Sequence, residues 1–506
     1  MPQPGTVYLV GAGPGDPGLL TLRGRDCLAR ADLVLYDGLV NPLLLRHARG
    51  VAQRTCRVEG PQGRRLDQAD INRQLIDAAR RGLTVVRLKG GDPLIFGRGG
   101  EEAQALAEAG IPYEIVPGIT AAAAVSAYAG IPFTQRETAS AVAFVTGHED
   151  PTKPASQIDY NALAQFPGTL VFYMGLHRAA AIAAALIDAG KPPDTPAAVV
   201  TRAATSHQRT VVSSLRRLGE DIAAAQLTPP SIIIVGDCVN HREEIAWFEK
   251  RPLLGRRIGI TRPEGQADAA IERCLELGAD PVLIPTIQIL PPEDWTEVDA
   301  TLDRLDDFDW LVFTSVNGVD QFFARLWERG ADARRLGRIK LAAIGSSTAQ
   351  ALETRNLRAD VVPESFRAEA LAEAMAPLVR GQRVLWARAS RGRDVLPAAL
   401  RDAGATVEEL VVYQNIDAES LPQPAVTLLE AGQLAWIGLS SPSIARRLPE
   451  LLTPQARAQI GTATRLAAIS PVTAQAALQA GLPVAAVADV FTWDGLLTAI
   501  AQAEGA

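Results

Sequence analysis

The sequence contains few cysteines, and they are scattered along the chain. Its 506 residues include Cys27, Cys56, Cys238 and Cys274, which form no CxxC pair, and the five histidines do not cluster with them. Zinc sites and disulfide frameworks need such residues at short, paired spacings. The sequence therefore predicts no metal, and it is typical of a chain that works in a reducing, cytoplasmic compartment.

Long hydrophobic runs and an excess of basic residues are missing as well. The longest apolar run, AAAIAAALI at residues 179–187, is far shorter than the roughly 20 residues that cross a bilayer. The first ten residues, MPQPGTVYLV, lack the basic and apolar segments of a signal peptide. The 50 Lys and Arg residues are outnumbered by 57 Asp and Glu residues, which gives a net charge of −7. Because no basic stripe offsets this balance, we expect neither a nucleic acid nor a membrane as a partner.

The chain does contain enough apolar residues for several cores. Hydrophobic residues make up 47% of it, and its length predicts three or four compact units. Apolar strands alternate with helical stretches, a pattern typical of α/β proteins with parallel sheets.

The stretch RLKGGDPLIFGRGGEE, residues 87–102, joins a predicted strand at 83–88 to a predicted helix. Loops at the carboxyl ends of strands are where α/β proteins bind ligands. Gly90 and Gly91 allow unusual backbone conformations, while Pro93 removes one amide donor and favours extended geometry at Asp92. The turn thus offers a carboxylate and carbonyls, which suit a cationic or donor-rich ligand better than a phosphate. A glycine-rich turn without a ligand is the alternative.

Two further loops follow predicted strands near the start of the chain. GAGPGDPG, residues 11–18, is similar to the GxGxxG dinucleotide fingerprint, but Asp16 replaces its third glycine and Pro14 has no amide for a pyrophosphate. A dehydrogenase is therefore disfavoured. The next predicted strand ends at Asp37, where a carboxylate is placed for proton transfer. It can equally cap the helix that NPLLLRHA predicts, and the residues alone leave both roles open.

The segments VYLVGAGPGDPGLLTL, RLKGGDPLIFGRGGEE and VPGITAAAAVSAYAGIP resemble motifs of the S-adenosylmethionine-dependent uroporphyrinogen-III C-methyltransferase family. The resemblance implies a two-lobed tetrapyrrole methylase fold, a homodimer formed through this half, and Asp37 as general base. Where the family usually has a lysine proposed as proton donor, this chain has Glu59, so that role is left unassigned. The residues implied to contact S-adenosylmethionine are Pro14, Gly90, Gly91, Asp92, Ile95, Thr120, Ala121, Met174, Ala203 and Pro230.

In the second half one pattern occurs six times: an apolar strand ends at a Ser, Thr or Gly cluster and leads into a helix. The hydroxyl groups are expected at helix N-caps, and the gathered helix N-termini also favour carboxylate binding. The segments TSVNGV, IGSSTAQAL, RASRGRDVLP, VVYQ and ISPVTAQAAL resemble uroporphyrinogen-III synthase.

This second resemblance implies that residues 257–482 close hydroxymethylbilane to uroporphyrinogen III while inverting the last pyrrole ring. It implies two Rossmann-like or flavodoxin-like α/β lobes joined by a two-stranded ladder made of PTIQIL and ELVVYQN. Tyr413 matches a tyrosine proposed to help the hydroxyl group leave, and packing between the lobes is its alternative role. The substrate-binding candidates are Ser315, Asn317, Ser347, Thr348, Arg393, Ser441 and Thr473.

Together the two resemblances predict a bifunctional enzyme that makes uroporphyrinogen III and methylates it at C2 and C7 to precorrin-2. The alternative is a methyltransferase for another precorrin position with a noncatalytic tetrapyrrole-binding second half. Whether the product serves sirohaem or cobalamin is left open. The predicted division is 1–117 and 118–247 for the methyltransferase lobes, 248–254 for a linker, 255–288 with 416–506 for the first synthase lobe, and 289–415 for the second.

Overall fold

The chain is an α/β protein, as the sequence predicts, and its described residues form four five-stranded sheets. The computed structural model describes residues 4–55, 67–148, 157–365, 367–392 and 394–505. The chain divides into two compact units. One comprises Met1–Ile258, Ala270–Pro281 and Leu497–Ala506, and the other comprises Gly259–Ala269 and Val282–Leu496. The finer division into four lobes and a linker stays a prediction.

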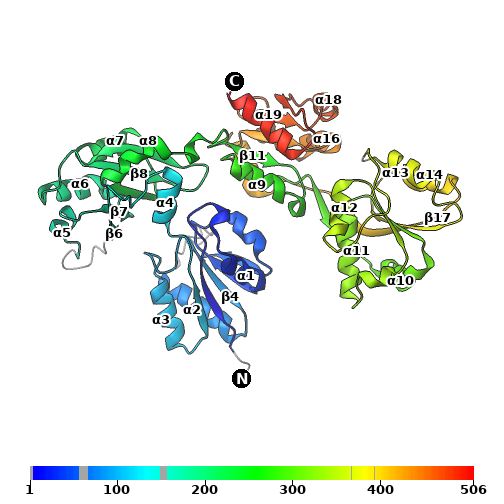
Figure 1. The fold of residues 1–506 in the computed structure, drawn as a ribbon, viewed down its shortest axis with the longest axis horizontal. Coiled ribbons are helices and arrows are strands. Elements are labelled where there is room, and N and C mark those ends of the chain that lie inside the picture. Colours follow the sequence, from blue (N-terminus) through cyan, green and yellow to red (C-terminus); the bar gives the residue numbers. More distant parts are fainter. Residues whose placement is uncertain (1–3, 56–66, 149–156, 366, 393, 506) are drawn as a thin grey trace. The chain divides into compact units, whose positions relative to one another are not determined.

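The first sheet is parallel, with the strand order β3-β2-β4-β1-β5. Its strands are β1 (Val7–Gly11), β2 (Leu33–Tyr36), β3 (Val51–Arg54), β4 (Val85–Lys89) and β5 (Tyr113–Val116), and the helices around it are α1 (Leu22–Arg30), α2 (Gln68–Arg80) and α3 (Gly99–Glu108) (Figure 1). Both faces are buried, because Leu9 and Val10 of β1 belong to different core clusters. Parallel strands place their carboxyl ends at one edge, so the loops after β1, β2 and β4 meet there.

The second sheet is mixed, with the order β6-β7-β10-β8-β9. Strands β6 and β7 pair in parallel, whereas β7 with β10, β10 with β8 and β8 with β9 are antiparallel. Its elements are β6 (Val142–Thr146), β7 (Thr169–Tyr173), β8 (Pro196–Thr201), β9 (Arg209–Ser214) and β10 (Ser231–Val235), with α4 (Ala121–Ala129), α5 (Tyr160–Ala164), α6 (Ala179–Asp188), α7 (Leu218–Ala224) and α8 (Arg242–Ile245). Helix α4 packs on this sheet through Ala122, Val125 and Ala129.

The third sheet has the order β12-β11-β18-β19-β20 and is built from two stretches of the second half that are far apart in sequence. Its strands are β11 (Arg257–Ile260), β12 (Asp280–Leu283), β18 (Trp436–Leu439), β19 (Arg465–Ala468) and β20 (Ala486–Val487). The helices of these stretches are α9 (Asp268–Glu276), α15 (Gln423–Glu430), α16 (Pro442–Leu451), α17 (Pro454–Gln459), α18 (Pro471–Gln479) and α19 (Trp493–Gly505).

The fourth sheet has the order β13-β17-β16-β14-β15. Its strands are β13 (Ile287–Leu290), β14 (Trp310–Phe313), β15 (Lys340–Ala343), β16 (Arg383–Ala389) and β17 (Thr406–Asp417), with α10 (Thr296–Asp303), α11 (Val316–Glu328), α12 (Ser346–Glu353), α13 (Ala368–Met375) and α14 (Val395–Asp402). Strand β13 pairs antiparallel with the end of β17, which is the ladder expected from PTIQIL and ELVVYQN.

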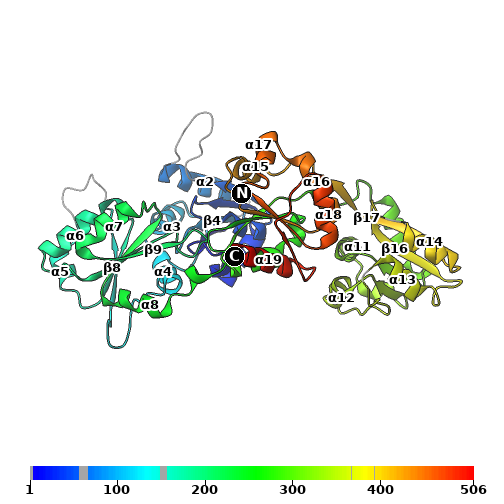
Figure 2. The ribbon, with the colours of Figure 1, turned by 90° about the horizontal axis from the view of Figure 1, so that it is seen from above.

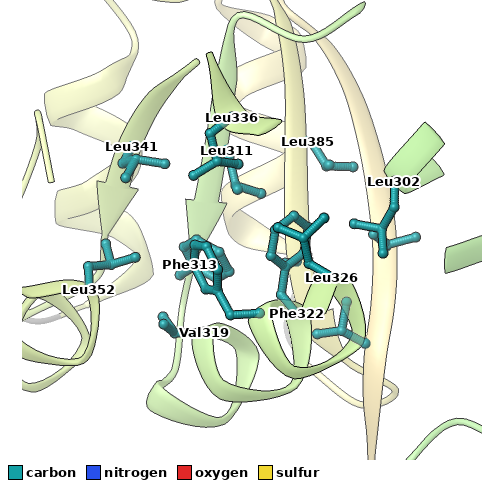
Figure 3. Close-up of a cluster of buried hydrophobic side chains, with 14 of the residues drawn as sticks. Leu302, Leu311, Phe313, Val319, Phe322, Leu326, Leu336, Leu341, Leu352 and Leu385 are labelled. Carbon is teal, nitrogen blue, oxygen red and sulfur yellow. The ribbon is translucent and has the colours of Figure 1, made fainter. Parts of the chain in front are cut away.

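Alternate residues of β14 fill two cores, one on each face of the fourth sheet. Phe313 packs against Phe322 of α11 with ring centroids 5.6 Å apart, inside the cluster that Figure 3 shows. Trp310 belongs to the cluster on the opposite face, together with residues of α13 and α14. Figure 2 shows these two helices beside β16 and β17. Strands buried on both faces need apolar residues in continuous runs, which is why WLVF carries no alternation.

Candidate active sites

One pocket in the first unit is lined by all ten residues that the sequence analysis assigns to cofactor contact: Pro14, Gly90, Gly91, Asp92, Ile95, Thr120, Ala121, Met174, Ala203 and Pro230. They come from both sheets and from the junction between them. The loops after β1 and β4 supply the first five, and helix α4 with the loops of the second sheet supplies the rest. Contact with a cofactor remains a prediction for each of these residues.

Three backbone segments approach closely at the base of this pocket. Gly91 has a φ of +72°, and it forms an antiparallel bridge with Gly13 in which each amide donates to the other's carbonyl, at 2.9 and 3.2 Å. Gly118 leaves no space for a side chain, because a Cβ atom there would lie 2.4 Å from the Gly91 oxygen and 2.7 Å from the Gly11 Cα. Glycine is required at Gly91 for its conformation and at Gly118 for the close approach.

Asp92 joins the loop after β4 to this junction. Its Oδ1 accepts from the amide of Leu94 at 2.8 Å, and its Oδ2 accepts from the amide of Gly118 at 3.0 Å. From the sequence we expect this carboxylate to face a ligand, whereas in the structure it first of all connects two backbone segments. Each carboxylate oxygen has a second lone pair, so both roles are compatible.

An aromatic group forms another wall of the pocket. The Tyr173 hydroxyl lies 2.7 Å from Thr120 Oγ1 and accepts from the amide of Ala122 at 3.0 Å. Thr120 occupies the N-cap position of α4, but its side chain makes no capping bond. The ring of Phe96 lies 4.7 Å from that of Tyr173 and the ring of Phe144 lies 5.9 Å from it. This arrangement makes one side of the pocket apolar, while polar side chains such as Asp16, Asn41 and Arg202 line other parts of it.

Strained backbone is concentrated around the same pocket. Among the described residues, seven other than glycine have a positive φ, and Phe96, Met174, Arg202 and Ala204 of these line the pocket. Such conformations are costly and persist where surrounding structure imposes them, often at functional sites. Met174 is 52% exposed, so it is not a core residue.

Asp37 directly follows β2, and only about a third of its side chain is exposed. Its Oδ1 accepts from Nη2 of Arg87 and from the hydroxyl of Thr55, the latter at 3.4 Å. The alternative role of helix cap is excluded, because Asn41 caps the following 3₁₀ helix, Pro42–His47, by accepting from the amide of Leu43. Gly38 and Leu39 line the pocket, so Asp37 lies at its border. Glu59 lies outside the described residues.

Sequence reasoning missed the charged residues behind Asp37. Arg87 and Lys89 lie within the apolar strand β4, and Glu102 lies in the first turn of α3; all three are buried. Glu102 Oε1 accepts from Arg87 Nε at 3.0 Å and from Lys89 Nζ at 2.9 Å. Burial lowers the pKa of the Lys89 ammonium, and the charge of Arg87 lowers it further. Two cations in an otherwise apolar strand were the available signal, since buried charges need partners.

In the second unit, the side chains of Tyr413 and Ser315 meet across strand β16, which lies between β17 and β14 in the fourth sheet. The Tyr413 hydroxyl, on β17, is 3.0 Å from Ser315 Oγ. Ser315 is the N-cap of α11, and its Oγ accepts from the amide of Gly318 at 2.9 Å. Tyr413 is buried, so its hydroxyl group is held within a packed environment.

The other substrate-binding candidates differ in accessibility. Asn317 and Ser347 lie in the first turns of α11 and α12, where Ser347 is exposed. Ser441 caps α16, as expected for these hydroxyl clusters. Thr348 and Thr473 are buried, and Ser470 rather than Thr473 caps α18. The N-cap of α12 is Gly345, without a side-chain bond. Arg393 lies outside the described residues.

No group of three or more His, Cys, Asp or Glu side chains suited to a metal ion occurs in the described part of the chain. No helix within the described ranges is long and apolar enough to cross a membrane.

Two family models match the chain. A model of Tetrapyrrole (Corrin/Porphyrin) Methylases matches residues 6–219, and a model of uroporphyrinogen-III synthase HemD matches residues 268–498. The porphyrin biosynthesis protein HemD of Ruminiclostridium josui is 35% identical over 440 residues, which is 87% of this chain and 87% of that protein. The uroporphyrinogen-III C-methyltransferase of Bacillus subtilis is 40% identical over 351 residues, which is 69% of this chain and 72% of that protein. The siroheme synthase of Pseudomonas entomophila is 49% identical over 248 residues, which is 49% of this chain and 53% of that enzyme.

Solved structures also resemble each half. The uroporphyrin-III C-methyltransferase of Thermus thermophilus, complexed with S-adenyl homocysteine, is 38% identical with a TM-score of 0.40, covering 46% of this chain and 93% of that one. A mutant uroporphyrinogen III synthase of the same species is 19% identical with a TM-score of 0.36, covering 49% of this chain and 98% of that one. On the two relatives that align over most of their own length, the chain belongs to the family of porphyrin biosynthesis protein HemD and uroporphyrinogen-III C-methyltransferase, and it joins a tetrapyrrole methylase segment to a uroporphyrinogen-III synthase segment.

Proposed function

We propose that the chain catalyses two consecutive steps of tetrapyrrole biosynthesis. The synthase segment closes hydroxymethylbilane to uroporphyrinogen III, and the methylase segment methylates that product at C2 and C7 to give precorrin-2. The observation that carries this proposal is the presence of both family segments in one chain, which aligns over 87% of its length with the porphyrin biosynthesis protein HemD of Ruminiclostridium josui. The product of one segment is the substrate of the other.

The pocket of the first unit fits S-adenosylmethionine. Its base is lined by Gly90, Gly91 and Asp92, which provide carbonyl oxygens and an acidic side chain for a positively charged, donor-rich molecule. Its aromatic wall and Met174 provide apolar contact. When bound, S-adenosylmethionine supplies a methyl group for transfer to carbon. The residues around it hold both reactants close together and keep water out, and such positioning contributes roughly 7–11 kcal/mol in favourable cases.

Asp37 accepts the proton that the macrocycle loses when its carbon is methylated. Its place at the border of the pocket and its partial exposure suit a group that exchanges protons with a substrate. A general base in such a position contributes about 10²–10⁴-fold to a rate.

In the synthase segment, Tyr413 assists the hydroxyl group of the linear substrate to leave. If Ser315 donates to the Tyr413 oxygen, the phenol O–H is free to donate to the departing oxygen. The expected result for Tyr413→Phe is a cyclisation rate reduced by roughly 10-fold or more, since a hydrogen bond to developing charge is lost. Methylation of supplied uroporphyrinogen III should be unchanged in the same variant.

The proposed function is tested by incubating the full chain with hydroxymethylbilane and S-adenosylmethionine. We expect a dimethylated tetrapyrrole of the III series, identified by mass and by assignment of the methylated ring carbons. Recovery of unmethylated uroporphyrinogen III alone would refute the methylase assignment, and absence of any enrichment in the III isomer would refute the synthase assignment. A methyl group at another ring position would favour the alternative precorrin methyltransferase. The predicted homodimer is tested by light scattering on the same material.

A further inference from the structure

The buried charges behind Asp37 form one connected cluster in the first sheet. Arg87 and Lys89 are two residues apart on β4, so their side chains leave the same face of the strand. The side chains of Arg87 and Glu102 are 2% and 0% exposed, whereas that of Asp37 is 31% exposed. Asp37 is therefore the most exposed member of the cluster, and the residues that follow it, Gly38 and Leu39, line the pocket.

Arg87 is fixed by hydrogen bonds through all three of its nitrogens. Nη2 donates to Asp37, Nε donates to Glu102, and Nη1 donates to the carbonyl of Leu35 at 3.3 Å and to Thr55 Oγ1 at 3.2 Å. A planar guanidinium group anchored at three points cannot rotate, unlike a lysine ammonium. The orientation of the Asp37 carboxylate is thereby determined.

The cluster leaves one oxygen of Asp37 available. Both hydrogen bonds that Asp37 accepts from described residues go to Oδ1, and none of these residues donates to Oδ2. Among the described residues, the charge that contacts Asp37 is that of Arg87 from β4, and behind it lie Glu102 from α3 and Lys89 from β4. Arg54 from β3 donates to the neighbouring carbonyl of Gly38 at 3.4 Å.

Glu102 connects the same cluster to the loop that carries Asp92. Lys89 immediately precedes Gly90, and Glu102 lies in the first turn of the helix that follows the loop. The ion pair between them, at 2.9 Å, therefore holds the two ends of that loop together. The carboxylate that completes the pair is also the one that holds Arg87.

We propose that Arg87 is a positioning residue for Asp37, and that Glu102 holds Arg87 and the loop after β4 in one rigid arrangement. The proposal rests on the proposed role of Asp37 as proton acceptor. It explains why a costly group of buried charges occupies a strand where apolar residues would suffice for stability. It assigns to the cluster a function in methyl transfer and none in cyclisation.

The first test is Arg87→Lys, which keeps the positive charge and loses the planar fork. We expect the turnover number for methylation to fall by roughly 10²-fold, the contribution of a well-placed general base, while the Kd of S-adenosylmethionine changes by less than about twofold and cyclisation is unchanged. Arg23→Lys is the matched control, because Arg23 also pairs with a carboxylate in this lobe but at the surface. An unchanged turnover number in Arg87→Lys would overturn the proposal.

A double-mutant comparison distinguishes this proposal from the role of Asp37 itself. If Arg87 acts through Asp37, adding Arg87→Lys to Asp37→Asn should cause no further loss of turnover. A further loss as large as in the wild-type background would contradict the positioning role. Wild-type turnover in Asp37→Asn alone would instead refute the proposed role of Asp37. If Arg87→Lys does not fold, Thr55→Val can be used instead, because it removes one of the groups that Arg87 contacts. We expect this variant to turn over several-fold more slowly with unchanged affinity for S-adenosylmethionine. Unchanged turnover in Thr55→Val would count against the proposal.

Discussion

Replacing Gly118 by alanine should disrupt cofactor binding by moving the loop after β4. The added Cβ would lie 2.4 Å from the Gly91 carbonyl oxygen, where ordinary contact needs 3.4 Å or more. Gly91 would have to retreat by about 1 Å, because the neighbouring atoms belong to the backbone and cannot rotate away. This movement would stretch the 3.2 Å hydrogen bond from the Gly13 amide to the Gly91 carbonyl.

The expected cost follows from these two effects. Overpacking of this kind typically costs about 1–3 kcal/mol, and loss of the hydrogen bond adds about 1 kcal/mol. If binding requires the loop in its present position, about 2–4 kcal/mol corresponds to a Kd for S-adenosylmethionine raised between roughly 30-fold and 1,000-fold. Isothermal titration calorimetry on the full chain measures this change, and cyclisation of hydroxymethylbilane in the same sample should be unaffected.

Gly100→Ala is the matched control for this experiment. Gly100 lies in the first turns of α3, and a Cβ there would meet no atom within 4 Å. Alanine should stabilise the helix by about 0.5–1 kcal/mol and leave the Kd unchanged. If Gly118→Ala bound S-adenosylmethionine as tightly as Gly100→Ala does, the argument from close backbone approach would be wrong.

Three other predictions concern separate parts of the chain. In Asp92→Asn, the side-chain NH₂ group would face one of the two backbone amides that now donate hydrogen bonds to the carboxylate. We therefore expect the affinity for S-adenosylmethionine to fall at least roughly 10-fold in calorimetry while cyclisation persists. Unchanged affinity would exclude a binding role for Asp92. Phe322→Ala should cost about 3–5 kcal/mol of unfolding free energy in urea, because Phe322 is fully buried, whereas Trp327→Ala on the same helix should have little effect because Trp327 is 73% exposed. Burial raises the pKa of the Cys274 thiol to about 12, so at pH 8 roughly one molecule in 10⁴ carries the thiolate. An alkylating reagent should therefore label Cys274 only as the chain unfolds, and mass spectrometry detects the label. Fast labelling of the folded chain would contradict the burial of Cys274.

The motifs predicted both families correctly. The ten residues assigned to cofactor contact come from six stretches of sequence and line one pocket, and their contact with a cofactor stays a prediction. The role of side chains within those motifs was less predictable. Thr120 occupies an N-cap position, yet its hydroxyl lies within hydrogen-bond distance of Tyr173 and makes no bond to the helix. Asp92 is expected to face a ligand, yet both of its carboxylate oxygens accept hydrogen bonds from backbone amides. A motif specifies where a residue lies in a loop, while its hydrogen-bond partner depends on which other segment arrives there.

The sequence by itself determined the α/β class, the two family segments and the loops that carry the chemistry, because strand and helix periodicity and loop composition are properties of short stretches. Only the tertiary structure decided that Asp37, Arg87 and Glu102 form one cluster, and that Ser315 meets Tyr413. These residues belong to separate segments that the sheets bring together, since β2 pairs with β4 and since β14 and β17 both pair with β16. Contacts of that kind depend on strand order, which no local pattern in the chain encodes.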